Sequence, residues 1–123
     1  MDSVPEIAGL DQAQGLRQLG GRVELFVRLL RRFAEQYRAA LPDLEQLLIR
    51  GERTAARRAA HSLKGAAASL GAVELTRLLE TFEAALDSQR DADEIADAGR
   101  TVVVSLSGLV NAIASALPPG PLS

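Results

Sequence analysis

The residues of this chain best suited to chemistry are His61 and Lys64, which lie three positions apart. The sequence holds one histidine, and Lys64 is the single lysine among 14 basic residues. An imidazole is a good nucleophile near neutral pH because a fair fraction of it is unprotonated. A phosphoryl group attached to it would bring about two negative charges, which a neighbouring lysine can partly offset. The pair is therefore suited to carrying a phosphoryl group.

The spacing of apolar residues predicts that both side chains stand on a helix over residues 53–70. At about 100° per residue, one side of this helix forms a core stripe of Ala56, Ala60, Leu63, Ala67 and Leu70. His61 falls roughly 140° from the centre of that stripe, so we expect it to be exposed. Arg57 lies one turn before His61 on the same face, Lys64 and Gly65 lie one turn after it, and Ala68 lies two turns after it.

Small residues beside His61 indicate room for a docking partner. Gly65 costs about 1 kcal/mol relative to alanine inside a helix, and its bare backbone lets another protein approach the imidazole closely. Ala68 continues the bare patch, and Arg57 and Arg58 add positive charge near it. The geometry alone leaves an ordinary surface histidine as the alternative.

Further helices must position this one. Asp11 and Gln14 are expected to form a capping box at the start of a short helix, which ends at Gly20 and Gly21. A long apolar pattern follows over residues 23–50, and Pro42 inside it predicts a kink or a break, because proline removes one backbone donor and clashes with the preceding turn.

Two more helices are predicted after Gly71, separated by a polar loop at 87–93. The β-branched run at 101–106 is interpreted as helix, because no second strand is available to pair with it. The short connections predict an all-α fold, an antiparallel up-down-up-down four-helix bundle with a short extra N-terminal helix. We expect a single domain over residues 1–123, with a core at about 7–117 and a flexible tail at 118–123.

Composition narrows the function. The 123 residues are 47% hydrophobic and 3% aromatic, which suits closely packed helices in one domain. The absence of cysteine excludes disulfides and thiolate catalysis, and one histidine offers no ligand set for a metal. A net charge of −2 argues against nucleic acid as a partner. No apolar stretch is expected to reach the ~20 residues of a membrane span, so we predict a cytoplasmic domain, free or at the cytoplasmic end of a membrane-anchored protein.

The run from His61 to Gly71, HSLKGAAASLG, resembles the motif of histidine-containing phosphotransfer (HPt) domains: H-x-L-K-G, small residues and a second glycine. The lead-in at 9–21 is similar to that of HPt domains in hybrid sensor kinases. The resemblance covers roughly residues 7–90 and implies a four-helix bundle. It further implies that His61 is phosphorylated, that Lys64 supports the phosphoryl group, and that Gly65 clears room for a receiver domain.

Three positions depart from the pattern of the family. Ala68 stands where many relatives have glycine, and Pro42 is expected to interrupt the long helix. Glu83 stands on the next helix, where some relatives carry an amide or a basic residue. A carboxylate facing His61 would weaken the stabilisation of a phosphoryl group.

The resemblance implies a module of a two-component phosphorelay that is not an autonomous enzyme. His61 would accept a phosphoryl group, through Nε2, from an aspartate of one receiver domain and pass it to another, the receivers belonging to response regulators or a hybrid histidine kinase. No cofactor is expected in this chain, which has no G-x-x-x-x-G-K-[ST] loop. The receiver domain is expected to bring Mg²⁺, and a monomer is the expected state.

Two other functions stay open. A phosphotransfer domain of a chemotaxis-type kinase would be phosphorylated on His61 by an ATP-binding kinase domain of the same protein. A helical interaction bundle would use no phosphorylation, and His61 would then be incidental.

Overall fold

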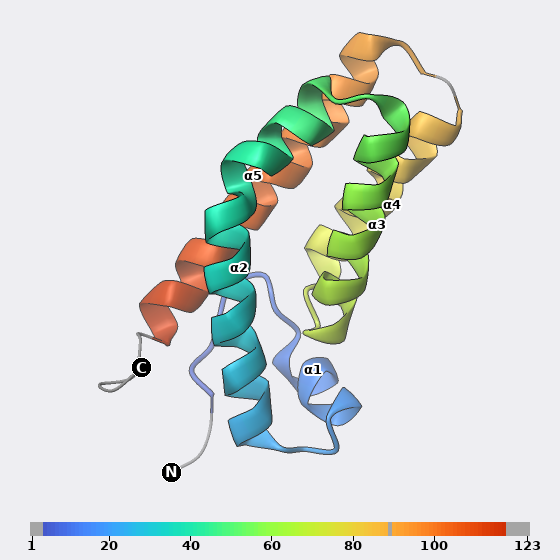
Figure 1. Cartoon of the computed structure of the whole chain (residues 1–123). Helices are drawn as coiled ribbons and strands as arrows, with labels where there is room; N and C mark the ends of the chain where they lie inside the picture. The colour runs from blue at the N-terminus through green and yellow to red at the C-terminus, as the bar shows by residue number, and fades with distance from the viewer. Residues whose placement is uncertain (1–3, 89, 118–123) are drawn as a thin grey trace.

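The computed structural model describes residues 4–88 and 90–117, and this part of the chain forms five helices (Figure 1). They are α1 (Gln12–Gln18), α2 (Val23–Arg50), α3 (Arg53–Ser69), α4 (Val73–Asp87) and α5 (Ala92–Ala116). In the bundle of α2 to α5 each helix packs on its chain neighbour, and α5 closes the bundle against α2. The predicted all-α four-helix bundle with an extra N-terminal helix is confirmed. The tail expected at 118–123 lies outside the described residues.

The bundle helices differ in length, and this leaves a place for α1. α2 and α5 have 28 and 25 residues, whereas α3 and α4 have 17 and 15. At 1.5 Å per residue the long pair extends roughly 15 Å beyond the short pair. α1 fills this end, against α2 and α3 (Figure 1). Gly15 allows the close approach, because a Cβ there would lie 2.6 Å from the carbonyl oxygen of Leu70.

The start of α1 also fastens it to the end of α3. The carboxylate of Asp11 accepts a hydrogen bond from the backbone N–H of Gln14 at 3.1 Å, as predicted. The N–H of Asp11, however, donates to the carbonyl oxygen of Gly71 at 2.7 Å. Only the first half of the expected capping box is therefore formed, and the other donor links α1 to the α3–α4 turn.

α2 passes through Pro42 without interruption, so the predicted break is wrong. The half of α2 that contains Pro42 leans away from the direction of the first half (Figure 1), which agrees with the alternative prediction of a kink. Pro42 is exposed, so the carbonyl that lacks its helical donor is on the solvent side. The packing of α5 along α2 supports the helix on the other side.

The core is apolar throughout the described residues, with no buried polar or charged residue. α3 contributes the predicted stripe, and all five of its members are buried. α2 and α4 contribute Phe26 and Phe82, both fully buried. On α4 and α5 the apolar residues Leu78, Ala85 and Ile95 are only half-buried. The bundle is therefore held by hydrophobic burial, and polar side chains are left to its surface.

By length and composition α5 could cross a membrane, so the expectation that no segment is long enough is wrong for this helix. This is weak evidence for a span, because a core helix of a soluble bundle passes the same test. Val102, Leu106 and Ile113 of α5 are fully buried, and the helix packs on α2 and α4. These buried positions account for part of its apolar character.

Candidate functional site

His61 stands on the outer face of α3, as predicted. Its side chain is 76% exposed, whereas Ala60 and Leu63 beside it are fully buried. α3 therefore presents the imidazole to solvent because its alanine-rich stripe faces the core. The backbone of α3 around His61 is regular helix, which fixes the ring on a rigid element.

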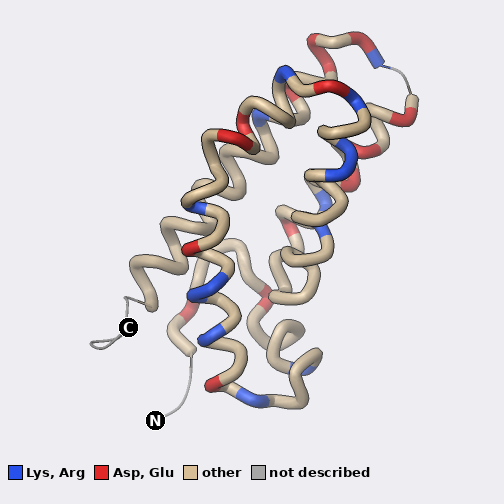
Figure 2. The backbone as a smooth tube through the Cα atoms, in the orientation of Figure 1, with Lys and Arg blue, Asp and Glu red and all other residues tan. Residues whose placement is uncertain are grey.

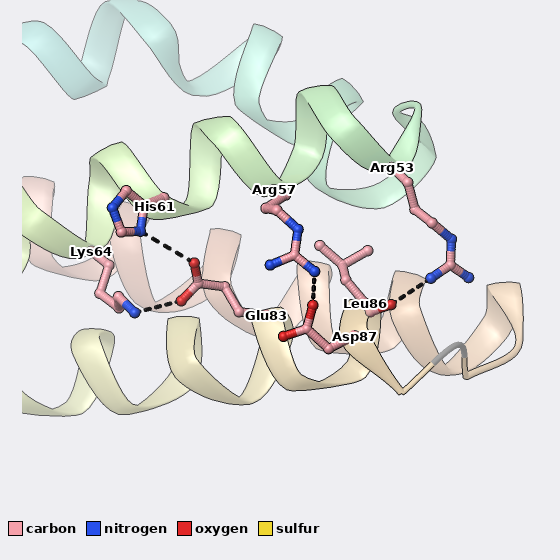
Figure 3. A network of polar contacts seen from close by, with 7 residues as sticks. All are labelled: Arg53, Arg57, His61, Lys64, Glu83, Leu86 and Asp87. Carbon is pink, nitrogen blue, oxygen red and sulfur yellow. Dashed lines mark hydrogen bonds and ion pairs between the residues drawn. The ribbon is translucent and has the colours of Figure 1, made fainter.

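Glu83 enters the site from α4, and its carboxylate points toward both His61 and Lys64 of α3 (Figure 3). One of its carboxylate oxygens, Oε2, is 3.5 Å from Nδ1 of His61. The other, Oε1, is 2.6 Å from Nζ of Lys64. The side chain of Glu83 is only 13% exposed.

The α3–α4 turn brings these residues together. Gly71 takes a positive φ of 80°, a conformation that glycine adopts without steric cost, and α4 begins two residues later. A Cβ at Gly71 would lie 2.3 Å from the carbonyl oxygen of Asp11, so the turn is also packed against the start of α1. α4 thus runs back along α3 in close contact, and this carries Glu83 to the level of His61.

Electrostatics at the site are dominated by the Lys64–Glu83 pair. The side-chain hydrogen bond with Glu83 holds the pKa of Lys64 above its usual value, so Lys64 stays charged at neutral pH. The side chain of Lys64 is 27% exposed, and its ammonium group is directed to the carboxylate (Figure 3). Nε2 of His61 lies on the side of the ring away from Glu83 (Figure 3) and is the nitrogen open to a reaction partner.

Gly65 and Ala68 keep the surface next to His61 bare. A Cβ placed on Gly65 would meet nothing within 4 Å, and Ala68 is exposed. Beyond Ala68, α1 reaches the same face, where Nε2 of Gln18 donates to the carbonyl oxygen of Ala68 at 3.0 Å. An open groove of about 340 Å³ at this end is bounded by Ala68, Val73 and Thr76, among others. The face of α3 next to His61 is therefore sterically open at Gly65 and Ala68.

Arg57 and Arg58, the two arginines predicted near the site, differ from each other in their surroundings. Arg57 forms an ion pair with Asp87 of α4, one turn away from His61 (Figure 3), so its charge is already engaged. Arg58 is exposed on α3. Arg53, to which no sequence pattern assigns a role, donates through Nη1 to the carbonyl oxygen of Leu86. With Arg57 it fastens the start of α3 to the end of α4 (Figure 3).

The charges along the bundle are mixed in sign (Figure 2). Over residues 4–88 and 90–117, no three side chains that could hold a metal ion gather in one place. The arrangement offers an exposed nucleophile, one oriented carboxylate and one cation. It can accept and release a group by nucleophilic substitution at Nε2.

Comparison with known families assigns most of the chain to a family. A family model described as Hpt domain matches residues 28–116, a range that contains His61, Lys64 and Glu83. No curated protein and no solved structure matches the chain.

Proposed function

The chain belongs to the Hpt domain family, whose members are histidine phosphotransfer modules of two-component phosphorelays and interact with receiver domains, and we propose that His61 is the residue that carries the phosphoryl group here. The observation that carries the proposal is the geometry of His61. The ring is exposed on a rigid helix, with a carboxylate at Nδ1 and open space over Gly65.

The contact at Nδ1 determines which nitrogen reacts. A carboxylate beside Nδ1 favours the tautomer with the proton on that nitrogen, which leaves the lone pair on Nε2. Nε2 attacks the phosphorus of an aspartyl phosphate on a receiver domain. A bond forms between Nε2 and phosphorus as the acyl oxygen–phosphorus bond breaks, and the aspartate leaves as a carboxylate. Such a transfer depends mainly on positioning and on charge stabilisation.

Each remaining feature has a place in this scheme. The receiver domain supplies Mg²⁺ and the in-line geometry, and this chain supplies the nucleophile. Gly65 and Ala68 form the surface over which the receiver docks, and Arg58 lies at its edge. We propose a hybrid-kinase type of module, which accepts from one receiver and donates to another, and which acts as a cytoplasmic monomer comprising one domain.

The test is phosphoryl transfer from receiver domains of the host, each labelled on aspartate with radioactive phosphate in the presence of Mg²⁺. The wild type should acquire label that is labile in acid and stable in base, as expected for phosphohistidine, and His61→Ala should acquire none. A folded wild type that no receiver labels contradicts the proposal. Label supplied instead by an ATP-binding kinase domain would identify a chemotaxis-type module, and no label from either source would favour an interaction bundle.

A further inference from the structure

Glu83 is unexpected in a site that has to stabilise a phosphoryl group. Phosphoryl groups are stabilised by cations and hydrogen-bond donors, yet the side chain nearest to both His61 and Lys64 is a carboxylate (Figure 3). A charge that is only 13% exposed has lost much of its hydration, so its position needs a compensating interaction. Its two partners are His61 and Lys64 themselves.

The first consequence concerns Lys64. Its Nζ is 2.6 Å from Oε1 of Glu83, and the two opposite charges largely cancel. A phosphoryl group on Nε2 would bring about two negative charges to a site where the lysine is already paired. Lys64 would have to leave a poorly hydrated carboxylate in order to reach it. The ion pair therefore limits how well Lys64 can stabilise the phosphorylated ring.

The second consequence concerns the leaving group. Oε2 of Glu83 is 3.5 Å from Nδ1 of His61, and a carboxylate oxygen beside this nitrogen favours the tautomer that has its proton on Nδ1. When the bond from phosphorus to Nε2 breaks, the electron pair returns to Nε2. With a proton on Nδ1 the ring departs as neutral imidazole; without it the ring would depart as an anion, which is a much poorer leaving group. Glu83 therefore favours loss of the phosphoryl group from His61.

We propose that Glu83 sets the lifetime of the phosphorylated state, so that His61 is a rapidly discharging carrier and not a store of phosphoryl groups. This inference rests on the proposed function of His61. In the step concerned, a carboxylate oxygen of the acceptor aspartate attacks phosphorus and the bond to Nε2 breaks. The proton remains on Nδ1 beside Glu83, and the acceptor receiver supplies Mg²⁺. Glu83 does not touch the phosphoryl group in this scheme and is a positioning residue that acts through His61 and Lys64.

The chain offers a matched control on the same helix. Glu80 lies one turn before Glu83, is exposed, and acts on Lys64 only through its charge. Glu80→Gln therefore removes the same charge from α4 without removing a contact to His61. Glu83→Gln keeps the size of the side chain and an oxygen acceptor for Nδ1 but removes the charge.

The experiment follows the loss of label from purified phosphorylated protein at pH 8, alone and after addition of an unphosphorylated receiver domain with Mg²⁺. We expect Glu83→Gln to lengthen the half-life and slow onward transfer roughly threefold to tenfold, the effect of one charge at short range. Glu80→Gln should stay within about twofold of the wild type. Glu83→Asp, which keeps the charge, should remain closer to the wild type than Glu83→Gln.

Two readouts separate the failures. If the wild type takes up no label on His61, the proposed function fails. If it does, and Glu83→Gln discharges as fast as Glu80→Gln, only the inference about Glu83 is overturned. Nitrogen-15 spectra of the unphosphorylated ring provide a signature that a merely structural role would not change. The wild type should hold its proton mainly on Nδ1, and Glu83→Gln should shift it toward Nε2. Unchanged ring spectra in a folded Glu83→Gln would also overturn the inference.

Discussion

Substitutions at Gly65 can distinguish an effect on receiver docking from an effect on the stability of the fold. A Cβ there meets no atom within 4 Å, and glycine is unfavourable in a helix interior, so Gly65→Ala should raise the free energy of unfolding by up to about 1 kcal/mol. Gly65→Gln should keep most of that gain but place a long side chain one turn from His61. We expect it to slow phosphoryl transfer roughly tenfold, equivalent to about 1.4 kcal/mol, as measured by initial rates of labelling.

Gly108 provides the control for this prediction. It also lies inside a helix, in α5, and a Cβ there likewise meets nothing within 4 Å. Gly108→Gln should therefore stabilise the fold in urea denaturation and leave the transfer rate unchanged. Equal transfer rates for Gly65→Gln and the wild type would show that the receiver does not approach over Gly65.

At the scale of single residues, the sequence predicts what depends on one helix alone. The exposure of His61 and the burial of Ala60 follow from the rotation of α3 about its own axis, and both are confirmed. The contact of Glu83 with His61 depends also on the level at which α4 packs against α3, which no periodicity specifies. From the sequence it was therefore possible to say what Glu83 would do if it faced His61, but not whether it faces His61. The pairing of Arg57 with Asp87 was missed for the same reason.

At the scale of the element, the start of α3 depends on an ionised cap. The carboxylate of Glu52 accepts a hydrogen bond from the N–H of Thr54 at 2.8 Å, and this bond holds the pKa of Glu52 below its usual value. A lowered folded-state pKa gives stability that is present above the ordinary carboxyl value and is lost as the pH falls through the lower one. Glu52→Ala should thus lower the urea midpoint at pH 7, and its difference from the wild type should shrink below about pH 4. A difference of equal size at pH 7 and pH 3 would contradict the role of the charge.

The contact between α2 and α5 depends on a second glycine. A Cβ at Gly99 would lie 2.3 Å from the carbonyl oxygen of Leu48, so the two helices must shift to admit it. Gly99→Ala should lower the free energy of unfolding by about 1–3 kcal/mol, whereas Gly108→Ala on the same helix should raise it by up to about 1 kcal/mol. Urea unfolding of the two variants should show opposite signs. An unchanged free energy of unfolding in Gly99→Ala would mean that α2 and α5 can move apart without cost.

These element-scale features also mark a limit of prediction. The helices and their order follow from apolar spacing and glycine stops, as at Gly20 and Gly71, and are confirmed. Whether Pro42 breaks α2 is decided by the neighbouring helix. Pro42 lies on the exposed side, and the packing of α5 on α2 continues along the helix, so the proline is tolerated. The need for glycine at position 99 likewise arises from a crossing that the sequence of α5 does not reveal.

At the scale of the whole molecule, the helices that carry the site residues are different from the helix that fills the core. His61, Lys64 and Glu83 come from α3 and α4, while α5 lies against α2 and α4 and fills the core. Leu106 of α5 is fully buried. Truncating it should therefore weaken the fold without changing the chemistry at His61.

Leu106→Ala should lower the free energy of unfolding by about 2–5 kcal/mol through lost burial and the cavity left behind. At a temperature well below its melting transition, where circular dichroism shows the helices intact, its phosphoryl transfer rate per folded molecule should match that of the wild type. The reason is that the contacts of Glu83 depend on the α3–α4 turn, which α1 fastens through the hydrogen bond from Asp11 to Gly71. A transfer rate several-fold lower in the folded variant would show instead that α5 sets the level of α4 against α3, and with it the distance from Glu83 to His61.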